Sequence, residues 1–199
     1  MGRLFLIVAA AAGIAWYASG RASAERHQQR LGAIASEIAG RHVGIHCQSL
    51  GGELIDVSTE DGKVKFDGDG RPADNAELKR KICKSLARFP RDLNLAAFRC
   101  VDTGAACAKR IRDDIWAAHV LAHESWHLAG QQAEDVAECN AVQTTAFVAS
   151  KLGARPARAQ AIAAYAWTTL YPGAPEGYRS DDCRNGGKLD LHPYSAVWP

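Results

Sequence analysis

The sequence predicts an α+β domain in which a small antiparallel sheet is followed by a mainly helical half, with disulfides joining the parts. Short strand-like runs separated by turn residues fill residues 42–66. From residue 108 the pattern is helical for about sixty residues, interrupted by glycine and proline. With 199 residues, of which 47% are hydrophobic, the chain can bury one sizeable core. Residues 25–199 are therefore expected to form a single domain.

Residues 1–24 have the order of a secretory signal. Arg3 precedes an apolar run over residues 4–18, and a small-residue step ends at Ala24. The run is shorter than a comfortable membrane span of about 20 residues, but it lies within the range for a tilted helix. Two interpretations stay open: a signal peptide cleaved near Ala24, and an N-terminal membrane anchor that tethers the protein through residues 4–20. Both predict a domain outside the cytosol, secreted or membrane-anchored.

The first half of the domain is expected to contain one helix and then the sheet. Apolar residues at helical spacing predict an amphipathic helix over residues 25–41. Three strand-like runs follow, "HVGIHC", "ELIDVS" and "KVKF", and the turns between them favour an antiparallel meander. Residues 67–75 are predicted to be a polar surface loop. Asp67 and Asp69 resemble the start of a calcium loop, but the later ligands are missing.

The second half is expected to be helical. A helix over residues 76–89, capped by Asp74 or Asn75 and ended by Pro90, should precede an irregular stretch. Three longer helices should then follow in order, over residues 108–128, over residues 133–151, and from Pro156 to a point before Pro172. The tail after them is loop-like.

Charge excludes one class of partner. Of 24 basic residues, Arg3 and Arg21 lie in the leader, and the remainder balance 22 acidic residues. A formally neutral domain has no electrostatic attraction for polyanions, so no nucleic-acid partner is expected.

The six cysteines are expected to form three disulfides. Their number is even, no CxxC pair suggests a zinc ribbon, and an exported chain meets an oxidising environment. Cys100 and Cys107 can close one local loop, and Cys183 can tie down the tail. The alternative is a set of buried free thiols. The cysteines are Cys47, Cys83, Cys100, Cys107, Cys139 and Cys183.

The stretch "HVLAHESWHLAG" carries the chemistry. His123 and His127 are four residues apart, so a helix places both imidazoles on one face, where they can share one zinc ion (Zn2+) with bonds of about 2.0–2.1 Å. Glu124 is rotated by about 100° from His123 and is expected to act on a metal-bound water rather than to bind the metal. It is the predicted catalytic base.

Two glutamates supply the remaining metal-binding residues. Glu134 and Glu138 are also four apart, and a tight turn near Gly130 would make their helix an antiparallel neighbour of the histidine helix. One of them completes a three-residue metal site with an open position for water. The other orients a metal-binding residue by a hydrogen bond, without contacting the metal. Sequence leaves the order open; we favour Glu134 as the ligand and Glu138 as its support.

The motif "HESWH" at residues 123–127, followed by "EDVAE" at residues 134–138, resembles the gluzincins, HExxH zinc peptidases whose third ligand is a glutamate on a following helix. In many of them this glutamate begins an ExxxD pattern, and Glu138 stands at the aspartate position. Residues 115–199 are also similar to a set of exported, uncharacterised actinobacterial proteins. The resemblance implies a zincin-like helical half, a bound zinc ion and a peptide or protein substrate.

Other interpretations remain. The domain could be a non-catalytic exported binding module that keeps the fold, or a metal-free, disulfide-rich envelope protein. His119 is expected to be a solvated or core histidine, and the alternative is an outer hydrogen-bond partner of the site. Four residues after the motif are candidates for stabilising an oxyanion: Tyr171, Tyr178, His192 and Tyr194.

Overall fold

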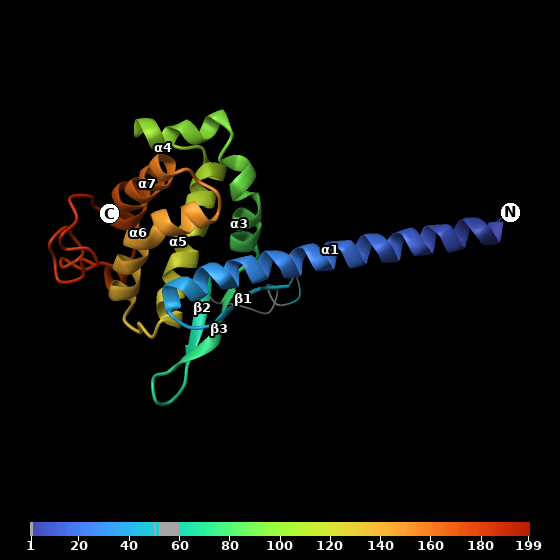
Figure 1. Cartoon of the computed structure of the whole chain (residues 1–199), viewed down its shortest axis with the longest axis horizontal. Helices are drawn as coiled ribbons and strands as arrows, with labels where there is room; N and C mark the ends of the chain where they lie inside the picture. Colours follow the sequence, from blue (N-terminus) through green and yellow to red (C-terminus); the bar gives the residue numbers. More distant parts are fainter. Residues whose placement is uncertain (1, 50, 52–59) are drawn as a thin grey trace.

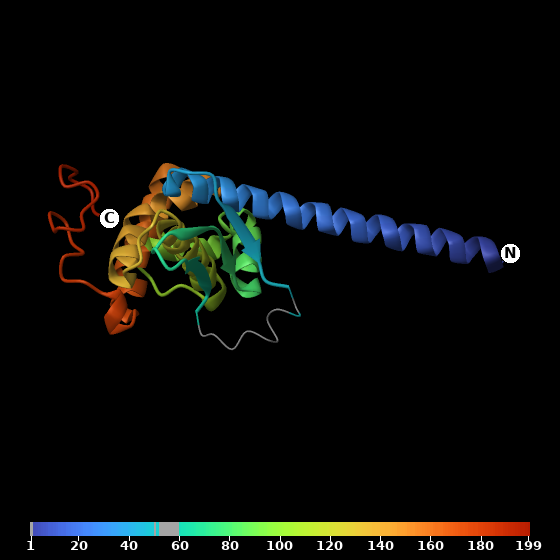
Figure 2. The ribbon, with the colours of Figure 1, turned by 90° about the horizontal axis from the view of Figure 1, so that it is seen from below.

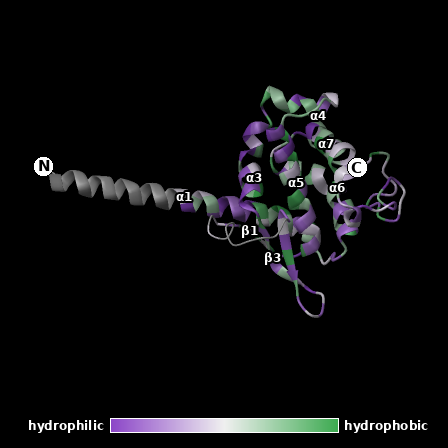
Figure 3. Ribbon diagram, turned by 180° about the vertical axis from the view of Figure 1, so that it is seen from behind, coloured by the Kyte–Doolittle hydropathy of each residue, from purple (hydrophilic) through white to green (hydrophobic). Residues whose placement is uncertain are grey.

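Helix α5 (Lys109–Leu128) lies at the centre of an α+β fold and contacts α1, α3, α6 and the sheet. The structure is a computed structural model and describes residues 2–49, 51 and 60–199. Figure 1 shows the helices around α5 on one side and the strands beside its C-terminal half. In Figure 3 the hydrophilic colour covers much of α3, whereas parts of α4 and α5 are hydrophobic. The α+β class is confirmed.

The C-terminal part of helix α1 (Gly2–Ala39) packs on the domain. Leu31, Ile34 and Ala35 are buried in the main core, which confirms the helix predicted over residues 25–41. The helix axis continues away from the domain toward the N-terminus (Figures 1 and 2). In the part of the chain that the structure describes, no helix combines the length and the apolar character that a membrane span requires.

The sheet is mixed, whereas an antiparallel meander was predicted. Its order is β1-β3-β2, with β1 (Gly44–Cys47) parallel to β3 (Pro72–Leu78) and β2 (Gly62–Phe66) antiparallel to β3. The run "ELIDVS" lies outside the described residues. The third strand, β3, instead comes from a segment for which the sequence predicts a loop followed by the start of a helix. Its buried residues Ala76 and Leu78 alternate with more exposed ones, as in a strand with one buried face.

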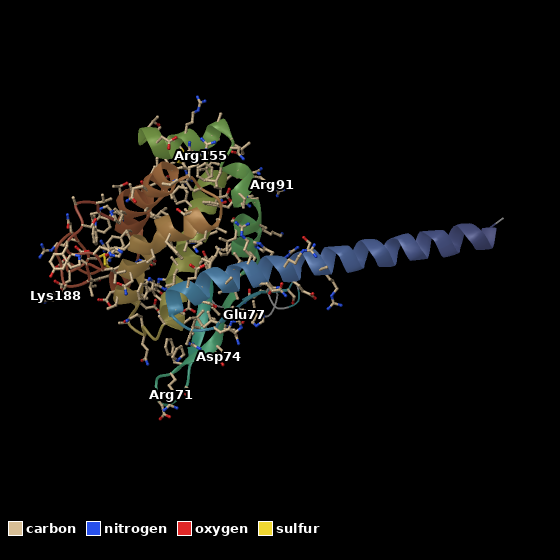
Figure 4. The ribbon with its side chains drawn as sticks, in the orientation of Figure 1. Arg71, Asp74, Glu77, Arg91, Arg155 and Lys188 are labelled. Atoms are coloured by element: carbon tan, nitrogen blue, oxygen red, sulfur yellow. A yellow bond between two sulfur atoms is a disulfide. The ribbon has the colours of Figure 1, made fainter. Side chains whose placement is uncertain are left out.

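A tight turn joins β2 to β3. The Asp67 carboxylate accepts hydrogen bonds from the backbone N–H groups of Asp69 and Arg71, and Gly70 adopts a positive φ of 76°. The predicted surface turn is therefore confirmed, although it is shorter than expected. Arg71 marks its tip in Figure 4.

Helix α3 (Arg80–Asp92) begins later and ends later than predicted. It starts at Arg80 because the preceding residues pair in β3, and it continues past Pro90. Asp92 in the last turn is buried and accepts hydrogen bonds from Arg110 Nε and Nη2 at 2.6 and 2.8 Å, which fastens the end of α3 to α5. The stretch predicted to be irregular contains two short helical turns, η1 (Ala96–Arg99) and α4 (Cys100–Thr103).

The three long helices after residue 108 are confirmed. They are α5, α6 (Glu134–Lys151) and α7 (Pro156–Tyr165), and α7 continues into a π-helical turn at Ala166–Leu170. Gly130 ends α5 with a φ of 103°, which a side chain would strain. The tail carries two further short turns, Tyr171–Gly173 and Glu176–Tyr178.

Of the three disulfides, one is local and two join parts that are distant in sequence. Cys100–Cys107 closes the predicted local loop, Cys47–Cys83 links β1 to α3, and Cys139–Cys183 links α6 to the tail. All six cysteines are paired, so the free-thiol alternative is wrong. Three disulfides indicate an extracytoplasmic or otherwise oxidising environment.

Candidate metal centre

The helical hairpin formed by α5 and α6 brings the predicted metal-binding side chains together. His123 and His127 lie one turn apart in the buried C-terminal half of α5, and Glu134 begins α6. The turn between the helices is short and passes through Gly130, so α6 runs back alongside α5. The cluster of His123, His127 and Glu134 is thus formed within one short stretch of the sequence.

Three possible ligand atoms converge at this point. His123 Nε2 and His127 Nε2 are 2.9 Å apart, and Glu134 Oε2 lies 3.1 and 3.2 Å from them. Ligand atoms on a tetrahedral zinc ion with bonds of about 2.0–2.1 Å would be separated by about 3.3 Å. The three side chains therefore form a group that could hold a metal ion, at nearly the spacing that zinc requires.

The outer nitrogens of both histidines are already engaged. His127 Nδ1 lies 2.5 Å from the carbonyl oxygen of Gln131, which can only accept, so this nitrogen donates. His123 Nδ1 lies 2.9 Å from Glu138 Oε2. In the metal-free chain a proton on His123 Nε2 hydrogen-bonds to the Glu134 carboxylate. With both Nδ1 atoms donating, loss of that proton leaves both Nε2 atoms and the carboxylate oxygen with lone pairs directed at one point, so the donor set fits zinc in place of the proton.

Glu138 lies behind His123 and is not one of the three convergent groups. Its buried carboxylate also accepts from His119 Nε2 at 2.9 Å, and His119 Nδ1 lies 3.1 Å from Thr145 Oγ1. Burial alone would raise the pKa of Glu138, but the charges and hydrogen bonds of the two histidines outweigh it and keep the pKa below its usual range. Glu138 is thus placed to orient His123. His119 is buried, so the expected core position is confirmed, and it also hydrogen-bonds to Glu138.

Charge and burial act in opposite directions on the ligand group. Burial would lower the pKa of His123, but hydrogen bonds to Glu134 and Glu138 outweigh it and raise the pKa to about 10. Hydrogen bonds from His123 and His127 hold the pKa of Glu134 at about 2. Glu134 is therefore an anion at any physiological pH, as a metal-binding carboxylate must be.

Glu124, the predicted base, is buried beside the cluster. Its Oε2 atom has no hydrogen-bond partner among the described residues, and its side chain lies against Gly62 of β2. Burial raises the pKa of Glu124 to about 7, partly offset by the nearby charges of His123 and His127. A buried carboxylate oxygen without a partner is costly unless it serves a ligand or a reaction.

The cluster opens into a cleft of about 510 Å³. One face of α5 supplies its floor, β2 supplies one wall through Val64 and Phe66, and Pro175 and Tyr178 lie in the other wall. Phe66 meets His127 edge to face, with ring centroids 6.1 Å apart. The floor is thus polar at the cluster, and both walls contribute apolar surface.

Of the four oxyanion candidates, only Tyr178 lines the cleft. Its ring stacks on that of His123, with centroids 5.9 Å apart. Burial and the nearby charge of Glu134 raise the pKa of Tyr178 to about 12, so the hydroxyl keeps its proton. The Tyr171 hydroxyl instead accepts from the backbone N–H of Ser180 at 2.9 Å, and Tyr194 is fully exposed in the tail.

Two groups of the site were missed from sequence. Gly62 belongs to a segment that looks like an ordinary turn, and the Gln131 carbonyl is a backbone group without a side-chain signature. No local signal identifies either one, because each becomes part of the site only when distant or non-helical segments fold against α5.

Comparison with protein-family models, with curated proteins and with solved structures finds no match to this chain. The resemblance to gluzincins therefore stays a prediction.

Proposed function

We propose that this protein is a zinc-dependent peptidase that acts outside the cytosol, either secreted or tethered through residues 4–20. In this proposal His123, His127 and Glu134 hold the ion, Glu138 supports His123, and Glu124 is the catalytic base. One observation carries it: three possible ligand atoms lie 2.9–3.2 Å apart with both outer histidine nitrogens engaged. A buried carboxylate oxygen without a partner among the described residues lies beside them.

In the proposed reaction zinc activates the water and the substrate, and Glu124 transfers the proton. Bound zinc would acidify a water molecule and polarise the substrate carbonyl. Glu124 takes one proton from the water while the water oxygen bonds to the carbonyl carbon. The same carboxyl then gives that proton to the amide nitrogen as the C–N bond breaks. Burial raises the pKa of the Glu124 carboxyl above its usual range, which favours its uptake of the proton.

The test is metal analysis of the full chain purified after export, combined with a peptide-library assay. We expect about one zinc ion per chain, hydrolysis that a chelator abolishes, and recovery when zinc is restored. A folded, disulfide-intact protein that takes up no zinc would contradict the proposal and favour the metal-free envelope protein. Bound zinc without hydrolysis of any peptide would favour the non-catalytic binding module.

Tyr178 is proposed to donate its hydroxyl proton in a hydrogen bond to the developing oxyanion. It lines the cleft beside His123, and its raised pKa keeps it a donor at neutral pH. Tyr178→Phe should lower kcat about a hundredfold and leave KM and zinc content near those of the parent. Tyr194→Phe, in the exposed tail, is the matched control. An unchanged kcat in Tyr178→Phe would remove this role.

A further inference from the structure

Gly62 begins β2 at the point where the strand meets α5. A Cβ atom added to it would lie 2.6 Å from Glu124 Oε1 and 2.7 Å from Glu124 Cδ. Cβ atoms in proteins essentially never come within 3.0 Å of another heavy atom in this way. Any side chain at this position must therefore displace the carboxyl group of Glu124.

The backbone does not explain the glycine. Gly62 is not one of the glycines with a positive φ, so alanine fits its conformation. The following residues of β2, Lys63 and Val64, carry ordinary side chains and pair with β3 in regular register. The absence of a side chain at residue 62 is therefore explained by the space that the Glu124 side chain occupies.

A second glycine brings the hairpin formed by β2 and β3 close to the same pair of helices, α5 and α6. Gly70, in the turn between β2 and β3, lies against Gln132 in the α5–α6 turn, and Gln132 Nε2 donates to the Gly70 carbonyl at 2.8 Å. The hairpin is thus held against the metal-binding helices at both ends. Its docking fixes how far β2 stands from the Glu124 side chain.

We propose that Gly62 is a positioning residue for Glu124. Its bare Cα lets β2 lie so close to α5 that the carboxyl is confined, with Oε1 against the strand and Oε2 left without a partner among the described residues. This inference rests on the proposed function, because it gives the confined carboxyl the task of proton transfer. A methyl group at residue 62 moves the base and leaves the three metal-binding side chains in place.

A double-mutant cycle on the metal-free protein tests the contact itself. Gly62→Ala should lower Tm by about 2–8 °C in the parent, because the added methyl overpacks the buried Glu124 side chain. In a Glu124→Ala background the methyl has room, and the same change should leave Tm unaltered. Gly68→Ala, where a Cβ would meet nothing within 4 Å, is the control. An equal fall in both backgrounds, or none in either, would overturn the inference.

The zinc-loaded protein tests the consequence. Gly62→Ala should keep about one zinc ion and a KM near that of the parent, while kcat falls about a hundredfold, as expected for a catalytic group displaced by about 1 Å. A Gly62→Ala protein with the parent's kcat would disprove the positioning role and leave the peptidase proposal intact. If the zinc-loaded parent hydrolyses nothing, the proposed function fails, while the cycle still decides whether Gly62 confines Glu124.

Discussion

Glu124→Gln is expected to retain about one zinc ion per chain and to lose peptide hydrolysis by a factor of about 10²–10⁴. Glutamine keeps the shape of the side chain beside Gly62, so the three convergent groups should stay in place. It cannot take a proton from water, so the step in which the carboxylate would act is removed. The measurement is kcat/KM on the best peptide of a library, together with zinc content.

Glu176→Gln is the matched control, because Glu176 is an exposed carboxylate in the turn that also carries Tyr178. It should hydrolyse the peptide at the rate of the parent. Undiminished hydrolysis by Glu124→Gln would show that another group is the base, and loss of zinc from this variant would show that Glu124 is needed for metal binding.

Two variants, Glu134→Gln and Glu138→Gln, should show which glutamate binds the metal and which one orients His123. Zinc at about a thousand times its Kd stabilises the folded parent by about 4 kcal/mol, equivalent to a rise in Tm of about 8–16 °C. Glu134→Gln removes one of the three convergent groups, so we expect the zinc-dependent rise to vanish. Glu138→Gln leaves the three groups present and should weaken zinc binding about 10–100-fold, so part of the rise remains.

Each variant must be compared with its own metal-free form. Glu138 is buried between His119 and His123, so its replacement should also lower Tm without zinc. Glu134 accepts hydrogen bonds from His123 and His127, so its replacement should lower that value too. A zinc-dependent rise that survives in Glu134→Gln and vanishes in Glu138→Gln would reverse the assignment of the two glutamates.

The cluster could be anticipated because it is local in sequence. His123 and His127 share a helix face, and the short turn at Gly130 leaves one way for the next helix to return. The same reasoning placed Glu134 and Glu138 near the histidines but could not order them. The order depends on which carboxylate lies level with each Nε2 atom, and that requires the relative rotation of the two helices.

The walls of the cleft could not be anticipated, because they come from distant parts of the chain. Tyr178 reaches His123 only because the tail folds back onto α6, and a pattern of spacing carries no information about that path. The strand Pro72–Leu78 was missed for a similar reason. Its Pro, Asp and Asn residues favour a turn locally, and pairing with strands on both sides overrides that preference.

The bond between Cys139 and Cys183 has a practical consequence. Cys139 follows Glu138 directly, and Cys183 lies a few residues after Tyr178, so one covalent link fastens the tail to α6. A chain produced in a reducing bacterial cytoplasm would lack this link, and the tail that carries Tyr178 would not be fastened to α6. Under the proposed function, such a preparation is expected to bind zinc without hydrolysing peptides, so the proposed activity is tested only on exported protein.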